Sequence, residues 1–488
     1  MTKRPQNGGG TAIYVLGSLA EGVFGMAFTM ILVRLISQED FGAWRQFMVL
    51  ANIALNVAVV GLPRSLMYFF STAKPEEQGA IGRRTMWLTL AIAVVTAIIF
   101  YFGLPFAAQR FDSPGLADNA FLFSTFLGLT FPVMTSIAFF IAARRLGLSA
   151  GVRVALAMLR LAALMVLVWG DASLKTFLIV MNVFALAQCV VLLTLYLKVS
   201  GPAMVPLWKN FRAQWKYSAD VAVQTVAGQV GGEMDKLLIS AAYNPVRFGS
   251  YSVGARELPL VPMIPYSITD SISPELSTLS VAGKFEEFRE LWHRWIKRAA
   301  LLMYPIFPLV LFQHNEIVTI LYTADYIEGA LPMLIVGCLI PLRITSFAQV
   351  LLSLNGSRVI MYSSIAMLIL ITSLSWIFLQ MFGLWGPALA ILIAEYMINS
   401  TLLFNISKRT GLSMVKVLPW SYLFRLLAIA VVSGALALPV LGLVSELGLF
   451  WRFMIYGLTM MILYGAIVLS LSMVNSDDLA LLRAKFRR

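Results

Sequence analysis

The chain has 488 residues, of which 59% are hydrophobic and only 12% are charged, and its mean hydropathy is +0.83. Soluble domains carry about 25% charged residues, so this composition excludes an ordinary soluble fold. Only two cysteines and two histidines occur, which excludes a disulfide framework and the common cysteine or histidine metal sites: Cys189, Cys338, His293 and His314. The composition predicts an all-α polytopic membrane protein.

Charge-poor runs, each bounded by Gly, Pro or charged clusters, follow one another along the whole chain. A transmembrane helix needs about 20 apolar residues. The sequence therefore predicts about 14 transmembrane helices. We expect them at residues 11–36, 42–70, 85–104, 119–141, 150–170, 173–197, 217–241, 248–275, 298–321, 331–353, 359–381, 386–405, 419–443 and 450–474.

Lysine and arginine are divided unequally between the alternating connections of these helices. One side collects both termini and most of the basic residues, and the other side holds only Arg34, Arg45, Arg110, Lys175, Arg247 and Arg452. Because basic residues close to a span resist translocation, both termini are predicted to be cytoplasmic, with the chain in a bacterial inner membrane. The net charge of +13 is explained mostly by this bias, so no nucleic-acid partner is expected.

The connections are too short to hold a catalytic domain. None exceeds roughly two dozen residues, whereas an independent domain needs about 50. No GxxxxGK[ST] motif for ATP binding occurs either. We therefore expect a transporter and not an enzyme. Residues 284–298 form an amphipathic pattern that predicts a helix lying on the inner membrane surface.

An internal duplication is indicated by two similar segments. Asp40-Phe41-Gly42-Ala43-Trp44 resembles Arg247-Phe248-Gly249-Ser250-Tyr251, with an offset of 207 residues. Six spans per repeat would keep both repeats in one orientation, related by a pseudo-two-fold axis along the membrane normal. The sequence predicts two six-helix lobes, residues 1–207 and 208–410, followed by two extra transmembrane helices and a basic cytoplasmic tail in residues 411–488.

Charged residues lie well inside several predicted spans. A charge at the centre of a membrane costs about 2.5–3.5 kcal/mol, so each needs a partner, a watery cavity or a function. The acids and bases balance in number, which leaves structural ion pairs between neighbouring helices as one explanation. The acids are Glu21, Glu233, Asp235, Glu257, Asp270 and Glu395; the bases are Arg64, Arg160, Lys236, Arg256, Arg343 and Arg425.

Three of the acids are candidates for ion coupling, with H⁺ or Na⁺ as the coupling ion and no other cofactor expected. Glu233 and Lys236 are three residues apart and could neutralise one another, which would leave Asp235 unpaired. Glu21 is the only carboxylate in its span; it is either a proton site or the partner of an arginine such as Arg64. The proton-coupling candidates are therefore Glu21, Glu233 and Asp235.

Four of the bases could line an anion-binding chamber between the lobes, because guanidinium and ammonium groups suit phosphate oxygens. These predicted substrate-binding residues are Arg64, Lys236, Arg256 and Arg343. Prolines in residues 248–275 predict that this span is bent, with backbone carbonyls freed towards a cavity: Pro259, Pro262, Pro265 and Pro274.

Several stretches resemble the polysaccharide flippases of the multidrug/oligosaccharidyl-lipid/polysaccharide exporter superfamily. They are the exit of the first span, residues 32–42; the stretch Asp235-Lys236-Leu237-Leu238-Ile239; and the proline-rich span of residues 251–276. The resemblance covers nearly the whole chain. It implies a flippase for O-antigen or exopolysaccharide repeat units, which moves an undecaprenyl-pyrophosphate-linked oligosaccharide from the cytoplasmic to the periplasmic leaflet by alternating access.

The same resemblance implies further expectations. A cationic cavity between the lobes would hold the pyrophosphate, lined by Glu21, Arg64, Asp235, Lys236 and Arg256. Membrane lipids, and a polymerase and chain-length regulator of lipopolysaccharide or exopolysaccharide synthesis, would be partners. A cation-coupled multidrug exporter of the same superfamily and a lipid II flippase remain alternatives. The lipid II branch has an arginine cluster in its first span, whereas Arg34 lies near the outer end here.

Overall fold

The computed structural model describes residues 8–59, 61–168, 170, 172–208, 211–257 and 260–473. Within these residues every regular element is a helix and no strand occurs, which confirms the prediction of an all-α chain. Large apolar side chains lie on the outside of the helices; Phe102 and Phe106, for example, are 66% and 74% exposed. Such surfaces suit contact with lipid chains. The chain is therefore a multi-pass membrane protein.

Ten helical stretches of the described residues are long and apolar enough to cross a membrane. The predicted runs 11–36, 217–241 and 248–275 are not among them, so the count of fourteen is not confirmed. The ten stretches are Gln38–Thr72, Pro75–Arg110, Ala120–Ala142, Gly147–Val168, Leu174–Ser200, Phe285–Tyr322, Ala324–Ser353, Ser357–Thr410, Trp420–Leu443 and Leu449–Ser470.

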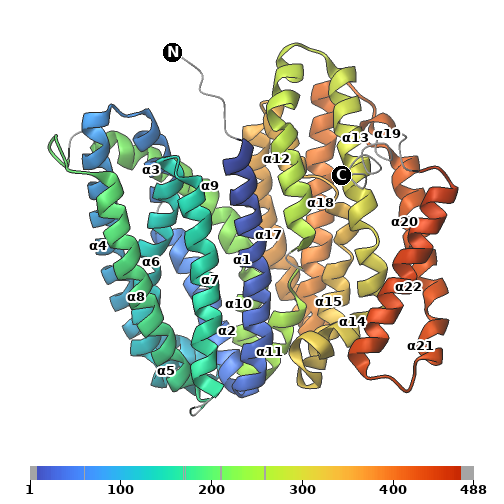
Figure 1. Cartoon of the computed structure of the whole chain (residues 1–488), viewed down its shortest axis with the longest axis horizontal. Coiled ribbons are helices and arrows are strands. Elements are labelled where there is room, and N and C mark those ends of the chain that lie inside the picture. Colours follow the sequence, from blue (N-terminus) through green and yellow to red (C-terminus); the bar gives the residue numbers. More distant parts are fainter. Residues whose placement is uncertain are drawn as a thin grey trace. The chain divides into compact units, whose positions relative to one another are not determined.

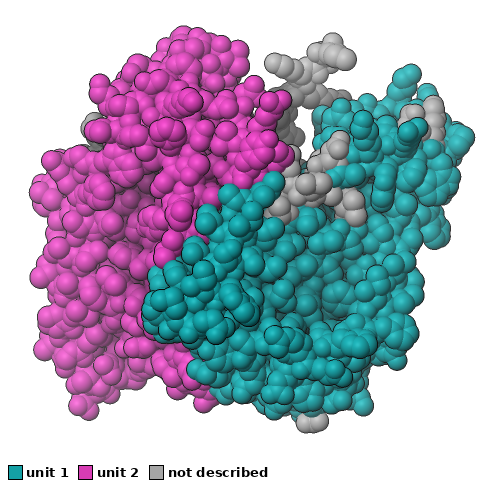
Figure 2. Space-filling view, turned by 180° about the vertical axis from the view of Figure 1, so that it is seen from behind, with its two compact units in different colours: residues 1–252, 364–390 teal, residues 253–363, 391–488 magenta. Residues whose placement is uncertain are grey.

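The chain forms two compact units, which Figure 2 shows in different colours. Unit 1 consists of residues 1–252 and 364–390, and unit 2 consists of residues 253–363 and 391–488. The division falls inside three helices, α11, α17 and α18, so the chain passes from one unit to the other within continuous helical segments. The predicted lobe boundaries near residues 207 and 410 describe a different division, based on the duplication, and stay a prediction.

Unit 1 contains the helices of the first half of the chain. Its helices α4, α6 and α8 run side by side, and α1 packs against α7 (Figure 1). The Tyr196 ring packs on Phe139 with ring centroids 4.1 Å apart, and its hydroxyl donates to the Gly82 carbonyl at 2.7 Å. The helices are α1 Gly8–Leu35, α2 Gln38–Ala58, α3 Leu62–Thr72, α4 Pro75–Arg110, α5 Pro114–Asp118, α6 Ala120–Ala142, α7 Leu146–Val168, α8 Leu174–Ser200, α9 Phe211–Gly231, α10 Met234–Ala242 and α11 Pro245–Gly254.

Unit 2 contains most of the second half. Its core is built around α13, where the Trp292 indole is buried and donates to the Thr345 hydroxyl at 3.0 Å. The helices wholly in unit 2 are α12 Leu260–Val281, α13 Phe285–Met303, α14 Ile306–Tyr322, η1 Ala324–Gly329, α15 Ala330–Gly337, η2 Ile340–Leu342, α16 Phe347–Ser353, α19 Met414–Val417, α20 Trp420–Ala437, α21 Pro439–Leu443 and α22 Leu449–Ser470. Helices α17 Ser357–Phe382 and α18 Gly386–Thr410 are shared between the units, and η3 Gly383–Trp385 belongs to unit 1.

The structure corrects the expectation for the amphipathic segment 284–298. Its apolar face, formed by Phe288, Trp292 and Ile296, is buried in the same hydrophobic cluster as Phe347 and Val350 of α16. The amphipathic pattern arises because one face of α13 meets the protein core, whereas a surface helix would present that face to lipid.

Four predicted membrane runs are broken helices. The run 42–70 is divided into α2 and α3 before Gly61, which has a positive φ of 68° that favours glycine. Between α9 and α10 the helix is interrupted at residues 232–233, and α11 ends at Gly254 before α12 begins at Leu260. The run 331–353 is divided into α15, η2 and α16. The predicted bend in 248–275 is thus a break, which precedes Pro265 and Pro274 inside α12.

Candidate functional site

Three of these breaks carry charged residues. Glu233 lies between α9 and α10, Arg256 and Glu257 lie after α11, and Arg343 follows η2. A broken helix leaves backbone donors and acceptors unsatisfied, which a membrane protein tolerates only inside protein or beside a watery cavity. Charges at membrane depth obey the same restriction. The breaks are therefore places where a polar site can exist.

The first charged network lies in unit 1 at the α9–α10 break. The Lys236 ammonium lies 3.2 Å from the Glu233 carboxylate, as the spacing of three residues predicts, and it donates to the Gly232 carbonyl at 3.1 Å. Asn52 of α2 donates its amide to Glu233 at 3.2 Å. This network therefore fastens the break to a neighbouring helix of the same unit.

Asp235 belongs to the same network, which corrects the expectation that it is unpaired. Its side chain is 1% exposed, one carboxylate oxygen accepts from the Tyr251 hydroxyl at 2.9 Å, and the other lies 3.6 Å from the Lys236 ammonium without a hydrogen bond. The spacing predicted the Glu233–Lys236 pair but gave no sign of Tyr251. Two carboxylates thus share one ammonium group at this break.

The second charged network lies in unit 2 and centres on Arg343. Its guanidinium donates to both oxygens of Glu257, with Nε at 3.1 and 3.2 Å, and to both oxygens of Glu395 on α18 at 3.3 and 3.1 Å. Asn399, one helical turn further along, donates to Glu395 at 2.9 Å. The Arg343 side chain is 14% exposed, so this is a largely buried ion triad that ties two helix breaks to α18.

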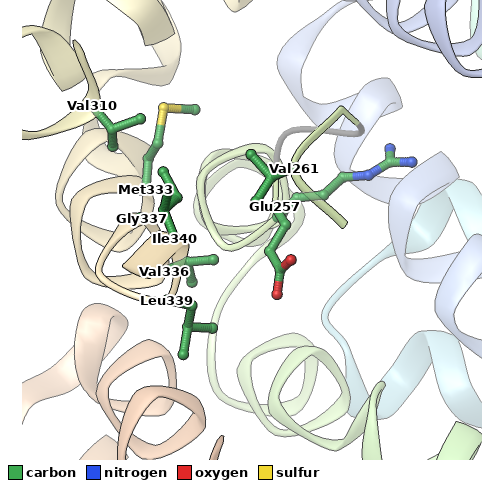
Figure 3. A pocket seen from close by; sticks show the side chains of 9 residues that line it. Glu257, Val261, Val310, Met333, Val336, Gly337, Leu339 and Ile340 are labelled. Carbon is green, nitrogen blue, oxygen red and sulfur yellow. The ribbon is translucent and has the colours of Figure 1, made fainter. Parts of the chain in front are cut away.

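A small cavity borders this triad, as Figure 3 shows. The Glu257 side chain lines it together with apolar residues of α14, α15 and the start of α12, among them Val261, Val310 and Val336. The cavity has room for about one water molecule and none for a sugar phosphate. This cavity therefore offers space for water beside the carboxylate but is too small for the substrate.

The remaining predicted site residues lie apart from these networks. Arg256 lines the same cavity, its side chain is exposed, and it forms no ion pair with any carboxylate that the structure describes. Arg64 is exposed near the start of α3. Glu21 of α1 accepts from Arg153 of α7 at 3.2 Å, so its partner is Arg153 and not Arg64.

One buried base was missed because the sequence placed it on a connection. Arg84 of α4 is only 1% exposed. Its Nε donates to the Gln214 side-chain oxygen at 3.0 Å, and its Nη1 donates to the Leu207 carbonyl at 3.0 Å. Gln214 in turn donates to Thr85 at 2.9 Å. A cavity of about 280 Å³ adjoins this network. In the sequence, Arg83 and Arg84 follow a charged segment and have the pattern of basic residues on a cytoplasmic connection. Only the fold shows that the Arg84 side chain is buried.

No group of three or more histidine, cysteine, aspartate or glutamate side chains that could hold a metal ion occurs among the residues with described positions. The two networks are mixed: each brings two carboxylates within ion-pair distance of one base. Such arrangements can bind or release a proton, or exchange a carboxylate for another anion, without a metal.

Comparisons with known proteins add a family and a fold. The sequence profile of a family described as "Polysaccharide biosynthesis protein" matches residues 31–331. Among curated proteins none matches the chain. The profile covers more than half of the chain, so the expectation from sequence of a polysaccharide-related family is confirmed at the level of this family.

Solved structures of transporters share the fold. The lipid II flippase MurJ in an inward closed conformation aligns with a TM-score of 0.71 at 12% identity, over 94% of this chain and 99% of its own. An inward-facing multidrug resistance MATE family transporter of the MOP superfamily aligns with a TM-score of 0.65 at 10% sequence identity. The alignment covers 80% of this chain and 95% of that transporter. The MATE multidrug transporter DinF-BH aligns with a TM-score of 0.59 at 13% sequence identity. The alignment covers 82% of this chain and 95% of DinF-BH. Identities this low indicate a common fold alone.

Proposed function

The chain belongs to the polysaccharide biosynthesis protein family, and from that premise we propose that it is a lipid-linked oligosaccharide flippase. The substrate would be an undecaprenyl-pyrophosphate-linked repeat unit of O-antigen or exopolysaccharide, moved from the cytoplasmic to the periplasmic leaflet of a bacterial inner membrane by alternating access. The observation that carries the proposal is the family match over residues 31–331, and the fold shared with a flippase of another lipid-linked precursor supports it.

The charged networks suggest how an anionic headgroup would be held. Lys236 and Arg343 already contact carboxylates, so a pyrophosphate would have to displace those acids before it could bind there. Arg256 is exposed beside a helix break and needs no such exchange. Of the four predicted substrate-binding bases we therefore propose Arg256 as the first contact, Arg64 as a second, and Lys236 and Arg343 as contacts made after a change of conformation.

The energy for outward movement can come from the membrane potential. With a negative cell interior, each negative charge that moves outwards across 100 mV releases about 2.3 kcal/mol. Coupling to H⁺ or Na⁺ would add to this, and Glu21, Glu233 and Asp235 remain the candidates for it. Asp235 is the strongest of the three because it is buried and one of its oxygens lacks a hydrogen-bond donor.

Reconstitution tests the proposal. Purified protein in liposomes is given a fluorescent undecaprenyl-pyrophosphate oligosaccharide, and the fraction reached by an external quencher is followed in time. We expect the wild type to equilibrate the lipid between leaflets and Arg256→Ala to do so at least about tenfold more slowly, the effect of losing one charge-assisted contact of about 1.4 kcal/mol. Arg358→Ala, which removes an exposed arginine of the start of α17, is the matched control.

A multidrug exporter is the second candidate, favoured by the fold shared with MATE transporters and by the excess of carboxylates in both networks. A cation substrate would seek those acids, whereas a pyrophosphate would seek the bases. Export of a cationic dye by cells that carry the protein, without any change in their surface polymer, would favour this alternative. A lipid II flippase would instead accept lipid II in the liposome assay.

A further inference from the structure

One face of α7 carries a stripe of side chains that are three or four residues apart and therefore lie one above the other. The stripe consists of Arg153, Ala157, Arg160, Leu164 and Leu167. Ala157, Leu164 and Leu167 are buried in the protein, whereas Met158 and Met165 on the opposite face are 55% and 51% exposed. The stripe is therefore the face that α7 turns towards its protein neighbours, and the opposite face suits lipid.

Arg160 is exposed although it lies in the middle of this otherwise buried stripe. It is about 21 Å along α7 from Leu146 and about 12 Å before the end of the helix at Val168. Side chains of a helix tilt towards its N-terminus, so Arg160 leans away from the nearer end. A charged group at such a depth needs a partner or water. Its exposure on the protein-facing side of α7 indicates that a polar ligand can reach it there.

Helix α1 places one acid beside the stripe. The two helices pack closely, because a Cβ atom on Gly17 would lie only 2.9 Å from the Ala150 Cβ. One turn further along α1, Glu21 accepts from Arg153 at 3.2 Å, and these side chains are 42% and 23% exposed. Glu21 also attracts Arg160, but no carboxylate that the structure describes forms an ion pair with Arg160. We name Glu21, Arg153 and Arg160 the α7 cation cluster.

We propose that the α7 cation cluster binds a phosphate group of the lipid-linked substrate, in addition to the four predicted substrate-binding bases. This inference rests on the proposed flippase function and deepens it.

The balance of charge favours an anion at this cluster. The networks around Lys236 and Arg343 each hold two carboxylates for one base, whereas the α7 cation cluster holds two bases for one carboxylate. Guanidinium groups match phosphate oxygens with parallel hydrogen bonds. Arg160 anchors the phosphate because no paired acid has to leave it first. Arg153 adds a second contact when the phosphate takes the place of the Glu21 carboxylate.

Native mass spectrometry of the full-length protein tests the site, because the mass of a bound lipid identifies it. The protein in detergent is titrated with undecaprenyl pyrophosphate, with phosphatidylglycerol and with uncharged undecaprenol. We expect Arg160→Gln to bind undecaprenyl pyrophosphate at least about tenfold more weakly than the wild type, and the control Arg358→Gln to bind it equally well. Glu21→Gln removes the competing carboxylate and should strengthen the binding at least about threefold.

Equal affinities of Arg160→Gln and the wild type would overturn the proposal, and so would weaker binding by Glu21→Gln. Equally tight binding of phosphatidylglycerol would identify a site for ordinary phospholipid headgroups and would refute the assignment to the substrate. The liposome assay separates this inference from the proposed function. Binding without movement of the lipid contradicts the flippase function alone, and equal movement by the wild type and Arg160→Gln contradicts the site alone. A wild type that binds no undecaprenyl pyrophosphate contradicts both.

Discussion

Removal of the guanidinium from the buried triad of unit 2 should destabilise the protein strongly. Arg343→Gln leaves the Glu257 and Glu395 carboxylates facing each other, and their side chains are only 23% and 20% exposed. Loss of one partner of a buried ion pair costs about 3–5 kcal/mol because the remaining charge is uncompensated. Here two charges remain, so we expect a loss at the upper end of that range, about 5 kcal/mol.

Thermal unfolding of the purified variant in detergent, followed by tryptophan fluorescence at one heating rate, measures this effect. The triple variant Arg343→Gln with Glu257→Gln and Glu395→Gln removes all three charges and should recover most of the loss, to within about 2 kcal/mol of the wild type. Arg358→Gln, an exposed arginine, should unfold like the wild type. If Arg343→Gln unfolded like Arg358→Gln, the triad would not stabilise the fold.

Three further substitutions test other packing and hydrogen-bond contacts. Gly42→Ala should lower the free energy of unfolding by about 1–3 kcal/mol because the new methyl group meets the Pro245 carbonyl. Gly249→Ala, whose methyl group makes only ordinary contacts, should unfold within about 0.5 kcal/mol of the wild type. Equal thermal-unfolding midpoints for the two variants would disprove this difference. Arg84→Lys loses the guanidinium that donates to both Gln214 and the Leu207 carbonyl, so the variant should unfold at a lower temperature than the wild type. An unchanged unfolding midpoint would show that these two hydrogen bonds do not stabilise the protein. Tyr251→Phe removes a donor from buried Asp235 and should cost about 1–3 kcal/mol; a smaller loss would imply that water replaces the hydroxyl.

Much of the fold follows from composition and local pattern. A low charged fraction and long apolar runs predict membrane helices, and most of the predicted runs coincide with helical stretches of the structure. The breaks are harder to predict. Pro265 and Pro274 suggested a bend but lie inside α12, while the helix ends earlier at Gly254. Charged residues at the breaks have partners far away in the sequence, as in the Arg343 triad, which no local pattern reveals.

The candidate site shows the same limit. Glu233 and Lys236 are three residues apart, so sequence spacing alone predicted their pair. The partners of Arg343 lie 86 and 52 residues away, and the partner of Glu21 lies 132 residues away. Charges in membrane spans could be counted from the sequence, but their pairing could not. The similar Phe-Gly segments were visible, and only the fold showed that they touch.

The proposal that this chain moves lipid-linked sugars across the membrane is tested most directly in a strain that lacks it. Surface polysaccharide and the undecaprenyl-pyrophosphate-linked precursor are measured together, with and without the gene restored. The account predicts that loss of the protein removes surface polymer and makes the lipid-linked precursor accumulate on the cytoplasmic leaflet, and that the restored gene reverses both changes. Unchanged polymer without precursor accumulation would contradict it.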